Sequence, residues 1–236
     1  MSEERNVILR TESVTKRFGG LVAVNNVSIR VERNKLTLLI GPNGAGKTTL
    51  VNLCTGVLRA DSGRILFRPN TSQDFIDITG MPPHQRYKLG ISRTYQIPQP
   101  FTSLTVLDNV LVALKSRGAN PIIAPIRSLW YKEEEENIRK AFDILRNVGL
   151  DKYWDQEARS LGAGHLKMLE VARALASGAK LVILDEPIGG TDPAYAFYIF
   201  ERLRELLTKT DITFLVVEHR IDIALPYADY VYVMDR

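Results

Sequence analysis

Cysteine and long hydrophobic runs are the two features that this sequence of 236 residues has least of. Its single cysteine, Cys54, excludes an internal disulfide framework and fits a reducing compartment. We expect Cys54 to be a packed core residue of a helix and not a nucleophile. No apolar run approaches the roughly 20 residues of a membrane span, and residues 1–5 lack the apolar segment of a signal peptide. Any membrane role is therefore expected to come through a partner.

The sequence also carries only a small excess of positive charge. The formal net charge is +4 and the pI is about 9.1. This balance suits a polyanionic ligand or an anionic membrane surface equally well, and it does not by itself indicate DNA binding. Hydrophobic residues make up 45% and charged residues 25%, as in ordinary globular domains. The length predicts one large domain or a domain with a subdomain.

The most informative stretch is residues 41–49, Gly-Pro-Asn-Gly-Ala-Gly-Lys-Thr-Thr. It follows an apolar run at 36–40 that is typical of a buried parallel strand, and it precedes residues 50–54, which can continue as a helix. This context is that of a phosphate-binding loop, in which glycines let successive N–H groups point at one anion. The alternative is a glycine-rich turn that binds nothing. The candidate phosphate-contacting residues are Asn43, Gly44, Ala45, Gly46, Lys47, Thr48 and Thr49, with Lys47 for the terminal phosphates and Thr48 for Mg²⁺.

The remaining pattern predicts an α/β fold with a mostly parallel sheet covered by helices, because apolar strands alternate with helical segments. A small antiparallel sheet is expected in the N-terminal part. Strands are expected at residues 7–11, 22–31, 36–40, 64–68, 90–96, 180–186, 212–218 and 230–234. Helices are expected at residues 105–115, after a capping box, and at 132–148, 166–177 and 194–208. The helical middle, residues 98–164, is expected to be a subdomain inserted between core segments 1–97 and 165–236.

Polar side chains follow several of the expected strands. Gln96, Asp185-Glu186 and His219 come at three strand ends, and the glycine-rich loop follows a fourth. Because ligands of open parallel sheets bind at the carboxyl ends of the strands, we expect these groups to converge. Asp185 suits Mg²⁺, and Glu186 can orient or deprotonate an attacking water. The alternatives are a plain acidic pair at a strand end and, for His219, a structural histidine.

The order of these segments resembles the nucleotide-binding subunits of ATP-binding cassette (ABC) transporters, which have a P-loop NTPase core. The resemblance implies that Phe18 stacks on adenine, that Val24 contributes to ATP binding, and that Gln96 senses the γ-phosphate and Mg²⁺. It also implies that Glu186 is the catalytic base and His219 the switch histidine. Asp192 matches the loop that communicates across the dimer; followed by Pro193, it is also a good helix N-cap, and both roles can hold.

One segment departs from the family pattern. The family signature is usually Leu-Ser-Gly-Gly-Gln, whereas residues 161–165 are Leu161, Gly162, Ala163, Gly164 and His165. In the family this segment lies on the partner subunit's ATP, so the serine hydroxyl bond is lost here while the backbone contribution can remain. A hydrogen bond to a charged group contributes about 1.5–3 kcal/mol. We therefore predict a weaker ATP-bound dimer and slower hydrolysis than in a relative that carries serine.

Residues 81–86 and 90–101, together with the long loop after Lys115, resemble the subfamily of branched-chain amino acid importers. In physical terms, these residues predict an apolar surface after Gln96 whose backbone is kept extended by proline. Such a surface could receive a loop from a membrane subunit. The alternative is that these residues form the core of the subdomain.

The sequence therefore leads to a main hypothesis: an ATPase subunit that binds ATP and Mg²⁺, forms a homo- or heterodimer around two ATP molecules and drives an amino acid importer. Its expected place is cytoplasmic, on the inner face of the membrane through permease subunits that work with a substrate-binding protein. A second hypothesis is an ATP-dependent regulatory or assembly switch with little hydrolysis. A third is a cassette acting on nucleic acid, which no basic cluster supports.

Overall fold

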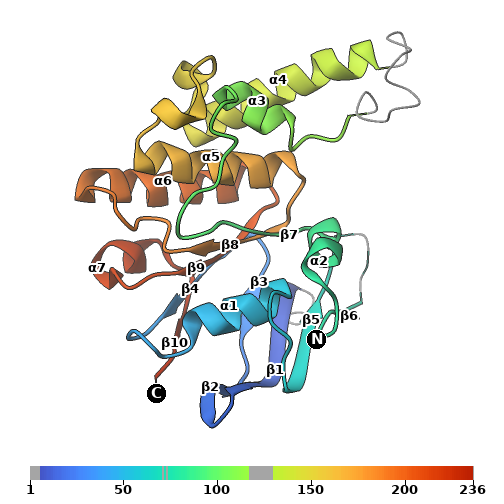
Figure 1. The fold of residues 1–236 in the computed structure, drawn as a ribbon, viewed down its shortest axis with the longest axis vertical. Helices are drawn as coiled ribbons and strands as arrows, with labels where there is room; N and C mark the ends of the chain where they lie inside the picture. The colour runs from blue at the N-terminus through green and yellow to red at the C-terminus, as the bar shows by residue number, and fades with distance from the viewer. Residues whose placement is uncertain (1–5, 71, 73, 117–129, 236) are drawn as a thin grey trace.

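A computed structural model describes residues 6–70, 72, 74–116 and 130–235 (Figure 1). The N-terminal part forms an antiparallel sheet in the order β2-β1-β5-β6, with β3 also paired to β1. Its strands are β1 (Val7–Phe18), β2 (Leu21–Val27), β3 (Arg30–Glu32), β5 (Ser62–Phe67) and β6 (Ile76–Asp77).

Two boundaries in this sheet differ from the expectation. The strand expected at 7–11 continues to Phe18, because its second half pairs with β2 while its first half pairs with β3 and β5. The strand expected at 22–31 is two strands, since Asn26 has a positive φ of 52° and the chain leaves the ladder after Val27. Ser13, with φ of 50°, lies at a register shift in the pairing of β1 with β5, between Glu12 and Thr15.

The second sheet is parallel throughout, in the order β10-β4-β9-β8-β7, which confirms the expected fold class. Its strands are β10 (Tyr230–Val233), β4 (Leu36–Ile40), β9 (Thr213–Val217), β8 (Leu181–Asp185) and β7 (Ile91–Arg93). Every residue of β4, β8 and β9 is buried, as continuous apolar runs predict for central strands. The strand expected at 90–96 ends early at Arg93. The N–H of Thr94 still donates to the carbonyl oxygen of Ile183 in β8, but that of Tyr95 donates to the side chain of Glu170, so the chain leaves the ladder there.

Helices cover both faces of the parallel sheet. The α-helices are α1 (Lys47–Thr55), α2 (Pro83–Leu89), α3 (Val106–Leu111), α4 (Tyr131–Val148), α5 (Ala163–Ala176), α6 (Pro193–Lys209) and α7 (Ile221–Ala224). Short 3₁₀ helices are η4 (Asp151–Tyr153), η5 (Ala158–Ser160) and η6 (Leu225–Tyr227). Figure 1 places α5 and α6 on one side of the parallel sheet, with α3 and α4 beyond them, and α1 on the side facing the antiparallel sheet. In the described residues no helix is both long and apolar enough to cross a membrane.

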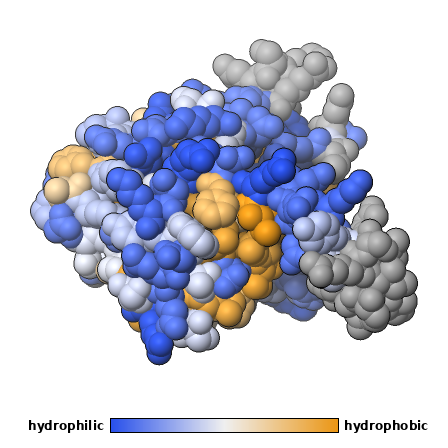
Figure 2. Space-filling view, turned by 90° about the horizontal axis from the view of Figure 1, so that it is seen from above, coloured by the Kyte–Doolittle hydropathy of each residue, from blue (hydrophilic) through white to orange (hydrophobic). Residues whose placement is uncertain are grey.

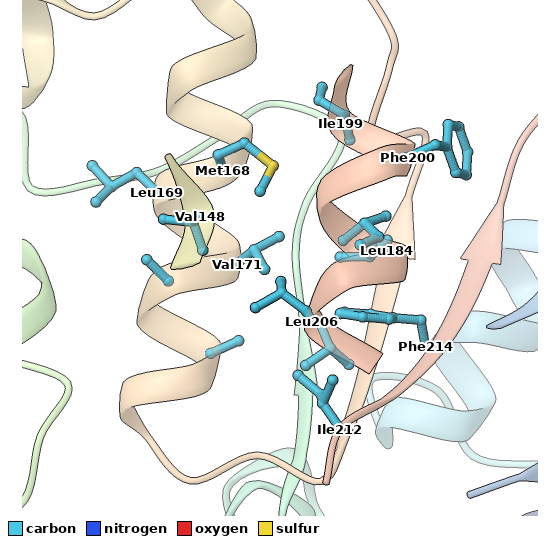
Figure 3. Close-up of a cluster of buried hydrophobic side chains, with 14 of the residues drawn as sticks. Val148, Met168, Leu169, Val171, Leu184, Ile199, Phe200, Leu206, Ile212 and Phe214 are labelled. Carbon is cyan, nitrogen blue, oxygen red and sulfur yellow. The ribbon is translucent and has the colours of Figure 1, made fainter. Parts of the chain in front are cut away.

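The side chains of the parallel sheet divide between two cores. Leu36 and Leu38 of β4 belong to the core shared with α5 and α6, whereas Leu39 belongs to the core shared with α1 and the antiparallel sheet. Figure 3 shows the first core, in which Met168 of α5 and Phe200 of α6 belong to the same cluster as strand residues such as Leu184 and Phe214. Fully burying one such side chain contributes roughly 1.5–3 kcal/mol, so these layers hold the strand ends in fixed positions.

Local signals in the sequence account for several helix boundaries. The expected capping residue Thr105 accepts a 3.0 Å hydrogen bond from the N–H of Asp108, although α3 ends at Leu111 and not at Lys115. Cys54 is fully buried in α1, and burial raises the pKa of its thiol to about 12, which confirms it as a core residue. The loop expected after Lys115 falls mostly in residues 117–129, which lie outside the described residues.

Candidate active site

The glycine-rich loop connects the end of β4 to the start of α1, which confirms the predicted strand–loop–helix context. Gly46 caps the helix with φ of 89°, and a Cβ atom there would lie 2.1 Å from the carbonyl oxygen of Ala23. A Cβ at Gly41 would lie 2.2 Å from the carbonyl oxygen of Met234. Only glycine fits at these two positions, so the loop can wrap closely beneath an anion.

Lys47 supplies a positive charge to this loop. Its Nζ donates to the carbonyl oxygens of Gly41, at 2.7 Å, and Pro42, at 2.9 Å, so the side chain lies over the loop and not out in solvent. The N-terminus of α1 adds unpaired N–H groups and the positive end of the helix dipole. Thr48 is exposed at this end of the helix, as a metal or phosphate contact requires. The arrangement combines the positive charge and the N–H donors that binding a phosphate group requires.

Of the other residues predicted to contact the nucleotide, some are accessible and some are not. Phe18 is 47% exposed at the end of β1, so part of its ring is accessible for stacking, although Lys16 Nζ lies over the ring, 5.6 Å from its centre. Val24 has 1% of its surface exposed and packs in the core beside α1. Around the loop, Asn43 and Gly44 are exposed, Ala45 is buried and Thr49 is half-buried.

The predicted catalytic residues come together at the ends of β7, β8 and β9. Gln96 Nε2 donates a 2.9 Å hydrogen bond to Glu186 Oε2, and His219 Nδ1 lies 3.6 Å from Glu186 Oε1. Glu186 itself has a φ of 50°, an unusual backbone conformation for a residue other than glycine, and its N–H donates to the carbonyl oxygen of Val217. The structure thus brings two residues from distant segments, Gln96 and His219, to one carboxylate that can accept a proton from water.

Asp185, next to Glu186 on the chain, makes a separate set of contacts, as expected for neighbours on a strand. Its Oδ2 accepts a 2.7 Å hydrogen bond from Arg93 Nη2, and Arg93 Nη1 donates to Asn52 Oδ1. Sequence reasoning missed Arg93; the available signal was an arginine near the carboxyl end of a strand that was expected to converge with the strand ending at Asp185.

The predicted metal ligands fit Mg²⁺ by their chemistry. Thr48 offers a hydroxyl oxygen, Asp185 a carboxylate and Gln96 an amide oxygen, which stays available because its Nε2 faces Glu186. Magnesium ions prefer such oxygen ligands, and usually bind through one or two carboxylates together with substrate phosphates. The described residues contain no group of three or more His, Cys, Asp or Glu that could hold a metal.

Two charged residues of α5 fix the backbone on both sides of Gln96. Lys167 Nζ donates to the carbonyl oxygens of Gln96, at 2.7 Å, and Glu186, at 2.9 Å. Glu170 accepts from the N–H groups of Gln99, at 2.8 Å, and Tyr95, at 3.3 Å. Burial lowers the pKa of Lys167 and raises the pKa of Glu170. Sequence reasoning missed both; opposite charges three residues apart on a mainly apolar helix were the signal.

Glu218 supports the catalytic loop from the end of β9. Its side chain is fully buried and accepts from the N–H groups of Ile188, at 3.1 Å, and His219, at 3.2 Å. Burial raises the pKa of this carboxyl, while the hydrogen bonds from the backbone oppose that shift. The chain after Glu186 is therefore tied to the strand that carries His219.

The segment in the signature position lies at the start of α5. Gly162 caps the helix in an extended conformation, Leu161 is buried, and Gly162 and Ala163 are exposed. A Cβ on Gly164 would lie 2.2 Å from Tyr195 Cε1, so glycine is required there.

The next residue, His165, packs between aromatic rings. Its ring lies 4.7 Å from that of Tyr153 and 5.0 Å from that of Tyr195, and burial lowers its pKa. Asp192 Oδ1 accepts a 3.0 Å hydrogen bond from the N–H of Tyr195, which confirms its role as the N-cap of α6. Tyr195 thus links the start of α5, at the signature position, to Asp192.

The surface after Gln96 adjoins a groove of about 380 Å³, lined among others by Tyr87, Arg93, Tyr95 and Arg173. Beside it Ile97 is 76% exposed, and Phe101 is 46% exposed with Arg173 packed 4.9 Å from its ring. Figure 2, which views the molecule from above relative to Figure 1, shows a hydrophobic patch set in a mainly hydrophilic face. Exposed apolar surface of this kind indicates an interaction site.

Comparison with known proteins agrees with this geometry. The family profile described as ABC transporter matches residues 24–189. A protein of Archaeoglobus fulgidus, described as probable branched-chain amino acid transport ATP-binding protein LivG, is 49% identical over 227 residues, covering 96% of this chain and 85% of that protein. The protein of the same description from Methanocaldococcus jannaschii is 44% identical over 227 residues, covering 96% of this chain and 86% of that protein.

Among solved structures, the ADP conformation of MJ1267, an ATP-binding cassette of an ABC transporter, matches with a TM-score of 0.80 at 44% identity, covering 97% of this chain and 87% of that one. The matched family region includes the glycine-rich loop, Gln96, the signature position and Glu186. Together, the matches and the convergence of strand ends lead to one conclusion. The chain belongs to the ABC transporter family, as an ATP-binding subunit and ATPase.

Proposed function

We propose that this chain hydrolyses Mg-ATP to power the import of branched-chain or related amino acids, with each ATP sandwiched in a head-to-tail dimer of ATPase subunits. The observation that carries the catalytic part is the cluster of Gln96, Glu186 and His219 at the strand ends that neighbour the glycine-rich loop. Phosphoryl transfer needs positioning and charge neutralisation, and the cluster offers both.

Each residue has a distinct task in this mechanism. Lys47 and the N–H groups of the loop hold the phosphates, and Glu186 accepts the proton of the attacking water. Gln96 and His219, both in contact with the Glu186 carboxylate, keep it oriented toward the terminal phosphate. Mg²⁺, held by Thr48, Asp185 and Gln96 together with the phosphates, would neutralise the negative charge that develops on them.

The dimer is supported by the exposure of the signature segment. Gly162, Ala163 and Asp192 are exposed at the N-terminal ends of α5 and α6. A second subunit placed head to tail would bring the N–H groups of its α5 to the γ-phosphate held by the first subunit's loop. We propose that residues 161–165 and Asp192 form this contact.

The choice of solute rests on the relatives. Proteins at 49% and 44% identity carry descriptions as probable branched-chain amino acid transport ATP-binding proteins. We propose the same role here, exercised at the inner face of the membrane through permease subunits and, through them, a substrate-binding protein. The groove beside Tyr95 and the exposed Phe101 are the proposed docking surface for a permease loop, with residues 98–164 as the helical subdomain that carries part of it.

Reconstitution tests the proposal. The chain, co-expressed with the membrane subunits of its transporter and reconstituted in vesicles with the matching binding protein, should support ATP-dependent uptake of leucine. Phe101→Asp should abolish co-purification with the membrane subunits, whereas Leu225→Asp, at a similarly exposed apolar residue of η6, should not. ATP hydrolysis without uptake of any branched-chain amino acid would contradict the assignment of the solute.

A second candidate, an ATP-binding switch with little hydrolysis, is favoured by one observation. Gly162 leaves the N-terminus of α5 without a side-chain cap or hydroxyl in the signature position. A steady-state ATPase assay of the reconstituted complex separates the two functions, because a switch would bind Mg-ATP without sustained turnover.

A further inference from the structure

Arg93 contacts the carboxylate that is proposed to serve the metal ion. Its Nη2 lies 2.7 Å from Asp185 Oδ2, and only 10% of the Arg93 side chain and 8% of the Asp185 side chain are exposed. The pair is therefore shielded from solvent. Charges that are shielded from water act on each other more strongly than charges at the surface. Any cation that binds Asp185 must share its negative charge with Arg93.

The other end of the guanidinium contacts the helix that carries Thr48. Arg93 Nη1 donates to Asn52 Oδ1, and Asn52 follows Thr48 by four residues in α1, so the two lie on the same face of that helix. One side chain of β7 thus links the helix of one proposed metal ligand, Thr48, to the strand of another, Asp185. This link runs through Asn52 and Asp185 alone.

An ion pair that only stabilises the fold could lie anywhere in the structure. Arg204 and Asp229 form an ion pair of the same 2.7 Å length between α6 and the start of β10, remote in the sequence from every proposed metal ligand. The Arg93 pair differs because its carboxylate stands at the carboxyl end of β8, directly before Glu186, where the nucleotide of a parallel sheet binds. Its positive charge acts on the ion site as well as on the fold.

We propose that Arg93 is a positioning residue that sets the affinity of the nucleotide site for Mg²⁺. It holds the Asp185 carboxylate toward α1 and offsets part of its charge, so that the ion binds through the nucleotide phosphates and leaves with the product. This inference rests on the proposed Mg²⁺ site at Thr48 and Asp185.

The experiment measures Mg²⁺ affinity directly, without turnover. ADP binding to the purified chain is titrated calorimetrically at a series of Mg²⁺ concentrations, and the dependence of ADP affinity on Mg²⁺ gives the affinity for the ion. Arg93→Gln should tighten Mg²⁺ binding by about tenfold, as expected when a unit positive charge is lost beside the ligand carboxylate. Arg93→Lys should keep the wild-type affinity within about threefold, because it retains the charge.

Arg204→Gln is the charge control, because it removes the same charge from another Arg–Asp pair, one in which 43% of the arginine side chain is exposed. It should leave Mg²⁺ affinity unchanged, and thermal unfolding of each variant verifies that it is folded. An Arg93→Gln variant with lowered thermal stability and unchanged or weaker Mg²⁺ affinity would overturn the proposal and leave Arg93 a structural residue. If ADP binding to the wild-type chain did not depend on Mg²⁺, the metal site itself would be refuted, and this inference with it.

Discussion

The side-chain amide of Gln96 donates a 2.9 Å hydrogen bond to the carboxylate of Glu186, across 90 residues of sequence. The same two residues are joined a second time, because Lys167 binds both of their backbone carbonyl oxygens. The segment that leads from the nucleotide site to the proposed permease groove is therefore connected directly to the proposed catalytic base. A displacement of that segment would move the carboxylate with it.

Replacing Glu186 by glutamine should separate binding from hydrolysis. Glutamine keeps the size of the side chain but cannot take a proton from water, so the rate of ATP hydrolysis should fall by about 10²–10⁴ while ATP affinity is retained. Steady-state ATPase assays and nucleotide titrations measure the two quantities. Glu201→Gln, on the exposed face of α6, is the control and should hydrolyse ATP normally. Normal turnover in Glu186→Gln would remove Glu186 from the mechanism.

Restoring a serine at Gly162 should strengthen the ATP-bound dimer and raise turnover. A Cβ there would lie 3.8 Å from the nearest side-chain atom, His165 Nδ1, so serine fits without rearrangement. Its hydroxyl could contribute up to about 1.5–3 kcal/mol in a hydrogen bond to the partner's ATP. Sedimentation in the presence of ATP measures dimerisation, with Glu186→Gln added to each variant so that ATP is not hydrolysed during the run. Gly162→Ala controls for the added carbon atom. Equal dimerisation and ATPase rates in both variants would refute the role of the missing hydroxyl.

Gly164→Ala should destabilise the fold, in contrast to Gly162→Ala. The added Cβ would lie 2.2 Å from Tyr195 Cε1, and such overpacking costs typically about 1–3 kcal/mol. Denaturant unfolding measures the change in the free energy of unfolding. In a double-mutant cycle with Tyr195→Ala, the two losses should be clearly less than additive because the clash has been removed. Additive losses would show that Tyr195 is not the obstacle.

The stability of the protein should depend on pH through His165. Burial lowers the pKa of this histidine below its ordinary value of 6.5, so below that pH the unfolded chain binds a proton that the folded chain resists. The free energy of unfolding should then fall as pH drops through the window below 6.5. His165→Phe keeps a ring between Tyr153 and Tyr195 but does not titrate, so the stability of the wild type relative to this variant should decrease from about pH 7.5 to pH 5.5. A constant difference over this range would contradict the prediction.

Much of the site could be predicted because its signals are local. The spacing of glycines before Lys47 and Thr48, following a continuous apolar strand, predicts a phosphate loop without any tertiary information. The buried runs that end at Asp185 and before His219 predict central parallel strands, and the topology of such sheets then places their carboxyl ends together. The hydrogen bond between Gln96 and Glu186 agrees with the convergence of strand ends that this rule predicts.

Strand limits were less predictable where one segment serves two partners. The extension of β1 to Phe18 and the division of residues 22–31 depend on pairing with three different strands. The burial of Val24 likewise results from packing against the core beside α1, which its neighbours in the sequence do not reveal.

The amino acid order by itself determined the phosphate loop, the parallel sheet and the approximate meeting point of the catalytic side chains, since each depends on short-range patterns and general rules of topology. The tertiary structure alone decided which supporting charges meet there. Arg93 reaches Asp185 across 92 residues, and Lys167 reaches Gln96 across 71. Such pairs depend on strand register and on how a helix is rotated against the sheet, and a shift of one residue in a strand would turn each of its side chains to the opposite face.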